Sequence, residues 1–217
     1  MRVSSLLVLV VTLAGCAAEL RPAPTAQVLP GPGRPATAAA AGVRVVAQTG
    51  VWQAYPPALD SVVTPMLVTV DNHSDVPLRI RHSDFALVSK DGRRFTALAP
   101  GEVHGAVVNP GPPAYAYSHG VFVARGDGGR RVIVLDGFPF DPFFDSFPGA
   151  TWTELPTPDM IRLALPEGAL APRTNAAGFV YFPRVPRKTS SADFSAALVA
   201  DRTGAPVATL TIPFVVD

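Results

Sequence analysis

Apolar and polar residues alternate along much of the chain from residue 43 onward, with a period of two. In the segment 77–82 (PLRIRH), Leu78 and Ile80 alternate with Arg79 and Arg81. Successive side chains of a β-strand point to opposite faces, so this spacing predicts a strand with one buried and one exposed face. Further short strands are expected at 43–48, 67–70, 85–89, 94–98, 120–125, 131–135, 178–182, 193–200 and 206–216.

Turn residues separate these segments and predict hairpins. Asp91-Gly92 lies between 85–89 and 94–98, and glycine suits such a turn because it tolerates positive φ. The sequences GDGG and DRTG are expected to make the same kind of connection farther along the chain. The elements on either side of each turn should therefore pair with one another.

Many short strands joined by tight turns predict a mainly β protein in which two antiparallel sheets pack as a sandwich. One short helix is expected at 157–165, with Thr157 as its N-cap, Pro158 in its first position and Pro166 after its end. No second linker or repeat interrupts residues 43–217, so these residues are predicted to form a single domain.

The first residues carry a separate signal. Arg2 precedes an apolar run from Leu6 to Leu13, which is too short to span a membrane and has the length of a signal-peptide core. The run ends in Leu13-Ala14-Gly15-Cys16, which resembles the lipobox of bacterial lipoproteins. The resemblance implies that residues 1–15 are a signal peptide removed before Cys16, and that the Cys16 thiol carries a diacylglyceryl group.

Cys16 is the only cysteine, so the exported domain would contain no disulfide, and its acyl chains would hold it on a membrane. Lipoproteins of this kind that carry Asp directly after the cysteine usually stay at the inner membrane. Ala17 stands there in this chain. The resemblance therefore implies a lipid-anchored protein of the cell envelope, at the outer membrane and facing the periplasm.

Residues 16–42 follow as a stretch rich in Ala, Pro, Thr and Gly, without aromatic residues. Such a composition buries too little surface to offset its ordering entropy. The stretch is predicted to be a flexible tether that spans about 30 Å as a coil. It would lift residues 43–217 off the membrane, and the strand pattern of that domain resembles the immunoglobulin-like domains of small bacterial lipoproteins.

The overall charge is nearly balanced. Lys and Arg together number 18, Asp and Glu number 17, and the signal peptide would remove Arg2. A nearly neutral chain argues against nucleic acid as a partner. No motif of a nucleophile with its base stands out, so no catalytic residue, cofactor or metal is assigned. The interpretation is a non-enzymatic accessory or binding module for another envelope component, either a protein or a glycan.

One region leaves an alternative open. His73 and His82 lie close in sequence to Asp71, Asp75 and Asp84, and a folded hairpin could bring imidazole and carboxylate groups together. These groups bind zinc and copper, so the alternative is a metal carrier or an enzyme that uses the region of His73, His82 and Asp84. The simpler interpretation is that these polar residues form turns through their own backbone.

Aromatic residues gather in the segment 137–152 (GFPFDPFFDSFPGATW), where prolines prevent a regular strand. One helical turn after Asp141 would put Phe143 and Phe147 on one face. The rings could close an open end of the sandwich, since each large buried ring stabilises a fold by about 1.5 to 3 kcal/mol. They could instead form an exposed contact patch made of Phe138, Phe140, Phe143, Phe144, Phe147 and Trp152.

Overall fold

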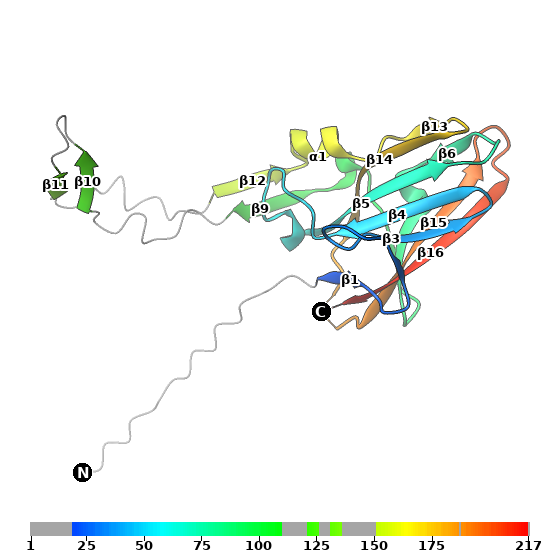
Figure 1. Cartoon of the computed structure of the whole chain (residues 1–217), viewed down its shortest axis with the longest axis horizontal. Coiled ribbons are helices and arrows are strands. Elements are labelled where there is room, and N and C mark those ends of the chain that lie inside the picture. The colour runs from blue at the N-terminus through cyan, green and yellow to red at the C-terminus, as the bar shows by residue number, and fades with distance from the viewer. Residues whose placement is uncertain (1–18, 110–120, 126–130, 136–150, 187, 217) are drawn as a thin grey trace, which may run out of the picture.

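The structure is a computed structural model, and it describes residues 19–109, 121–125, 131–135, 151–186 and 188–216 (Figure 1). These residues form two larger β-sheets, two two-stranded ribbons and a short helix. The named strands pair antiparallel throughout. The prediction of a mainly β protein with antiparallel sheets and one short helix is therefore confirmed.

The larger sheet has seven strands. Five follow in the order β1 (Leu20–Pro22), β16 (Pro206–Val216), β15 (Ser191–Ala200), β6 (Leu78–Ile80) and β13 (Gly168–Leu170). In addition, β7 (Phe85–Ser89) pairs with β15, and β8 (Arg94–Thr96) pairs with β7. The hairpins predicted at Asp91-Gly92 and at DRTG are confirmed as β7–β8 and β15–β16.

The second sheet has five strands. Their order is β14 (Thr174–Pro183), β5 (Val63–Asn72), β4 (Val43–Thr49), β3 (Ala36–Ala40) and β2 (Gln27–Val28). Buried and less buried residues alternate along β5, as expected of a strand with one face on the core. Figure 1 shows this sheet lying over β15 and β16 of the larger sheet.

Two ribbons complete the strands. One consists of β9 (Gly105–Asn109) and β12 (Thr151–Leu155), and the other of β10 (Val121–Arg125) and β11 (Arg131–Leu135). The predicted pairing of β10 with β11 across GDGG is confirmed, from Val121 opposite Leu135 to Arg125 opposite Arg131. Short 3₁₀ turns lie at Leu59–Ser61, His82–Asp84 and Pro100–Glu102.

The single helix, α1 (Pro158–Leu163), begins as the sequence predicted. The Thr157 hydroxyl accepts a hydrogen bond from the Met160 backbone N–H, and Pro158 takes the first helical position. The proline suits this place because its missing N–H has no partner there in any helix. The helix directly follows β12, so it is held at the base of the β9–β12 ribbon.

The predicted tether is wrong for residues 19–42. Leu20 is only 2% exposed and pairs with Val216, and β3 pairs along its whole length with β4. Ladder hydrogen bonds between β3 and β4 offset the ordering entropy that composition alone suggested would dominate. The folded part therefore begins no later than Leu20 rather than at Val43. Cys16 and the signal peptide lie outside the described residues.

The two larger sheets share one hydrophobic core. Its fully buried residues come from both sheets, including Val45, Val68 and Val180 from one and Phe85, Phe194 and Phe214 from the other. The Phe182 ring of β14 meets the Phe194 ring of β15 edge-on, with 6.2 Å between centroids. Such edge-to-face pairs add to the stability gained from burial alone.

A second, smaller cluster lies beneath the β9–β12 ribbon and positions the site described below. It contains Leu59, Val103, Val107, Leu155, Met160, Phe179 and Tyr181. The Trp52 ring packs edge-on against Phe179 at 4.9 Å, and the Tyr181 hydroxyl donates to the Met160 carbonyl oxygen at 2.9 Å. The ribbon and α1 are therefore fixed to the edge of the five-stranded sheet by packing and by a buried hydrogen bond.

Gly178 of β14 allows the segment after α1 to lie directly on this sheet. The Leu165 backbone N–H donates to the Phe179 carbonyl oxygen at 2.9 Å. A Cβ atom on Gly178 would stand 2.4 Å from the Leu165 backbone nitrogen and Cα. Only glycine permits this approach, because real Cβ atoms do not come so close to backbone.

Candidate contact surface

Trp152 is the one residue of the predicted aromatic patch that the structure describes, and it is 74% exposed. It lies on β12 directly opposite Val108 of β9, which is 41% exposed. Their side chains share the outer face of the ribbon, because the opposite face carries the buried Val107 and Leu155. We call the outer pair, Val108 and Trp152, the Trp152 surface.

The inner face of the ribbon is held by hydrogen bonds as well as by packing. The Asn109 amide donates to the Thr153 hydroxyl oxygen at 2.8 Å, and the Thr153 hydroxyl also bonds to the hydroxyl of Tyr55. Tyr55 comes from the loop that follows β4, so these bonds tie the ribbon to the five-stranded sheet. The backbone beneath Trp152 is consequently well supported.

Two more large apolar side chains are exposed on neighbouring elements. Ile161 of α1 is 60% exposed, and Tyr55 is 48% exposed. The Tyr55 backbone N–H donates to the Asp159 carboxylate at 3.0 Å and so joins this loop to α1. Among the residues whose side-chain burial the structure describes, which leaves out those of β10 and β11, the only other large exposed apolar side chain is Val76, in the turn between β5 and β6. Within that set, most of the large exposed apolar side chains belong to the ribbon, the β4–β5 loop and α1.

The charged groups beside the Tyr55 loop are Asp159 and Arg162, both on α1. The hydrogen bond from the Tyr55 backbone N–H is the main cause that lowers the pKa of Asp159 below its usual range. The Arg162 guanidinium, 3.0 Å from the carboxylate, lowers it further. The carboxylate is therefore ionised at neutral pH and neutralised by its partner. Burial, and secondarily the charge of Asp159, raises the pKa of Tyr181, so its phenol stays protonated and donates to Met160.

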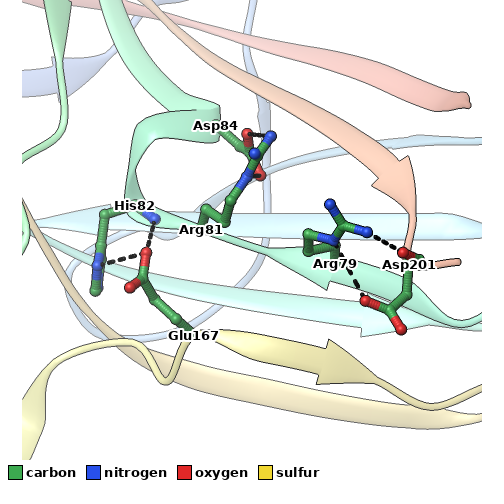
Figure 2. A network of polar contacts seen from close by, with 6 residues as sticks. All are labelled: Arg79, Arg81, His82, Asp84, Glu167 and Asp201. Carbon is green, nitrogen blue, oxygen red and sulfur yellow. Dashed lines mark hydrogen bonds and ion pairs between the residues drawn. The ribbon is translucent and has the colours of Figure 1, made fainter. Parts of the chain in front are cut away.

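The region of His82 and Asp84 makes polar contacts in a different part of the fold. Figure 2 shows Asp84 turned toward Arg81 and His82 turned toward Glu167. Arg81 holds Asp84 with two hydrogen bonds, of 2.8 and 3.2 Å, and this contact raises the pKa of the Arg81 guanidinium. A glutamate oxygen of Glu167 accepts from the His82 backbone N–H at 2.6 Å and lies 3.1 Å from Nδ1.

The contact between His82 and Glu167 connects the turn that follows β6 with the segment between α1 and β13. Arg79, also in Figure 2, pairs with Asp201 in the β15–β16 turn at 3.3 Å. His73 is exposed beyond the end of β5, where its backbone N–H donates to the Gly42 carbonyl oxygen at 2.8 Å. Within the described ranges, no group of three His, Cys, Asp or Glu residues lies close enough to hold a metal ion. The structure therefore adds no support to the metal-site hypothesis.

A shallow cleft lies at the β1 end of the domain. Its volume is about 310 Å³, and its lining consists of Glu19, Leu20, Thr49, Gly50, Trp52, Pro57, Asp60, Val63, Thr64 and Pro65. The cleft lies where β1 joins the loop between β4 and β5. Two carboxylates and one aromatic side chain do not form a catalytic arrangement by themselves.

Of the exposed apolar residues on and around the ribbon, the sequence analysis identified Trp152 alone. Phe138, Phe140, Phe143, Phe144 and Phe147 lie outside the described residues, as does the anchor Cys16. Val108, Tyr55 and Ile161 were missed. Thr151–Leu155 alternates threonine with other residues and could have been identified as a strand, but no feature of residues 105–109 indicates which strand they would pair with.

No helix in the described part of the chain is both long and apolar enough to cross a membrane. No protein-family model, curated protein or solved structure matches the chain.

Proposed function

We propose that this protein is a non-enzymatic accessory lipoprotein of the bacterial cell envelope. It is anchored to the membrane through Cys16 and carries an immunoglobulin-like β-sandwich. This domain binds another envelope protein through the Trp152 surface. The observation that carries this proposal is the 74% exposure of Trp152 directly opposite the exposed Val108. Tryptophan is enriched among the residues that dominate binding energy at protein interfaces.

Rigid support strengthens this argument. Single exposed apolar residues are common on protein surfaces. Trp152, however, stands on a ribbon whose other face is buried through Val107 and Leu155 and is bonded through Asn109 and Thr153. A partner would have little backbone to order on binding, which reduces the entropic cost of association.

A protein partner fits the surface better than a glycan does. The outer face of the ribbon combines Trp152 and Val108 with Ala106 and Glu154, so it offers apolar area and few hydrogen-bonding groups. The lipobox resemblance at Cys16 and the absence of Asp at position 17 support an envelope location, at the outer membrane and facing the periplasm. The proposal requires no cofactor, metal or nucleic acid.

Site-specific photo-crosslinking in the source organism tests the proposal. A photoreactive amino acid at position 154, on the same face of β12, should join the lipidated protein to a discrete envelope protein. Trp152→Ala in the same chain should abolish that adduct. Because Trp152 is exposed, this change should leave the free energy of unfolding within about 0.5 kcal/mol, so the loss would not reflect unfolding.

Val76 provides the control position. It is as exposed as Val108 but lies in the β5–β6 turn, away from the ribbon. A photoreactive residue at position 76 should give no adduct of the same size. An adduct at position 154 that survives Trp152→Ala, or identical adducts at both positions, would refute the Trp152 surface as the binding site.

A further inference from the structure

The folded domain begins very close to the predicted lipid anchor. Leu20 pairs with Val216 of β16, and its carbonyl oxygen accepts a hydrogen bond from the Thr49 hydroxyl at 2.5 Å. Its side chain is almost completely buried in the main core. Cys16 lies four positions before this fixed point, with three residues between them.

This spacing limits how far the domain can stand from a membrane. A chain reaches at most 3.3 to 3.6 Å per residue, so the Cα atoms of Cys16 and Leu20 lie within about 14 Å of each other. The polar headgroup layer of one leaflet is itself about 5 to 8 Å thick. A flexible tether up to residue 42 would have allowed about 30 Å of separation, but that segment is folded into β1, β2 and β3.

The elements at this end of the domain are known from the strand directions. β1 begins here, β4 ends at Thr49, β5 begins at Val63, and β14 ends at Pro183. The connecting residues form one surface, where the Arg184 guanidinium donates to the Ser61 carbonyl oxygen at 3.1 Å. We define the β1 end surface by Glu19, Gly50, Pro57, Asp60, Ser61 and Arg184, which are all exposed.

We propose that the β1 end surface faces the phospholipid headgroups of the membrane that holds Cys16. The inference rests on the lipid anchor of the proposed function, and it adds the orientation of the domain. The β15–β16 turn at residues 201–204 lies at the other end of the sheet. Since β15 has ten residues, that turn is up to about 33 Å farther from the membrane.

This orientation also restricts the partner. Tyr55 belongs to the loop between β4 and β5 at the β1 end, and its hydroxyl bonds to Thr153 beside Trp152. The ribbon is consequently at the same end of the domain as β1, as Figure 1 shows. The Trp152 surface would meet a partner that is itself embedded in the membrane or held close to it.

Spin-label relaxation on lipid vesicles tests the orientation. The mature lipidated chain is placed in phosphatidylethanolamine and phosphatidylglycerol vesicles that contain a lipid with a nickel-chelating headgroup. Because the Cys16 sulfur would be blocked by its lipid, Ser61→Cys or Thr203→Cys provides the single reactive thiol for a nitroxide. Both positions are exposed, one on the β1 end surface and one in the far turn.

We expect strong relaxation enhancement by the nickel lipid at position 61 and severalfold less at position 203. A 20-residue Gly/Ser insertion between Ala18 and Glu19 adds a coil of about 25 Å. It should lower the enhancement at position 61 and remove the difference between the two positions. Equal enhancement at both positions without the insertion, or no effect of the insertion, would overturn the proposed orientation.

Mass spectrometry of the N-terminal peptide separates the two possible failures. Without lipid on Cys16, the anchor and the orientation are both wrong, and the vesicles should bind no protein. With lipid present and equal relaxation at positions 61 and 203, the anchor stands and only the orientation is wrong. Cys16→Ser gives the control that has no anchor, since it lacks the thiol that would be acylated.

Discussion

Leu20→Ala tests whether the N-terminal segment is part of the fold or a tether. Leu20 is 2% exposed and belongs to the core that both larger sheets share. Replacing a buried leucine by alanine removes three carbons and leaves a cavity, which typically costs about 2 to 5 kcal/mol. For a tether residue without contacts, the same change would leave the free energy of unfolding within about 0.5 kcal/mol.

The size of the expected effect makes the assay straightforward. In a chain of 150 to 250 residues, each kcal/mol lowers the melting temperature by about 2 to 4 °C, so Leu20→Ala should lower it by about 4 to 20 °C. Urea denaturation followed by circular dichroism measures the free energy directly. Leu29→Ala is the matched control, because Leu29 lies in the same segment but is only half-buried. Leu29→Ala should lower the free energy of unfolding clearly less than Leu20→Ala does.

Equal and small effects of the two leucine substitutions would show that residues 19–42 do not fold onto the domain. That result would restore the long tether and remove the basis for placing the β1 end surface at the membrane. Removing residues 19–40 completely extends the test. The shortened chain lacks β1, β2 and β3, loses the buried Ala36 and Thr37, and should be strongly destabilised.

Two further substitutions test backbone and polar features of the fold. Gly178→Ala puts a methyl group 2.4 Å from the Leu165 backbone and should cost at least about 1 to 3 kcal/mol, whereas Gly101→Ala, with no atom within 4 Å, should be nearly neutral in thermal melts. Asn72→Ala removes the buried amide that donates to the Val76 carbonyl at 2.9 Å and should cost about 1 to 3 kcal/mol in urea titrations. Asn175 is exposed, so Asn175→Ala is the control. If it lowered the free energy of unfolding as much as Asn72→Ala does, the buried hydrogen bond would not be the cause of the loss.

The sequence by itself determined most of the strands and their local connections. Alternation of apolar and polar residues located β6, and glycine-containing turns located the β7–β8, β10–β11 and β15–β16 hairpins. The N-cap at Thr157 located α1. These features depend on side-chain direction and on backbone angles within a few residues, so they can be read without knowing what lies across the core.

Only the tertiary structure decided the role of residues 19–42. Alanine and threonine carry too little apolar surface to mark a buried strand, so β3 has no signal of its own. It is a strand because β4 supplies hydrogen-bond partners along its whole length, while Leu20 finds its place in a core built by residues far along the chain. Such pairings are non-local, and local composition contains no information about them.

The exposure of Trp152 and Val108 also depends on the tertiary structure. Trp152 could be singled out in the sequence as an aromatic residue near many others, but whether its ring was buried or exposed depended on which face of β12 met the smaller core. The structure buries Leu155 and Val107 and so turns Trp152 and Val108 outward. Since a shift of one residue in register exchanges the two faces of a strand, the exposure of Trp152 is a property of the pairing and not of the sequence around it.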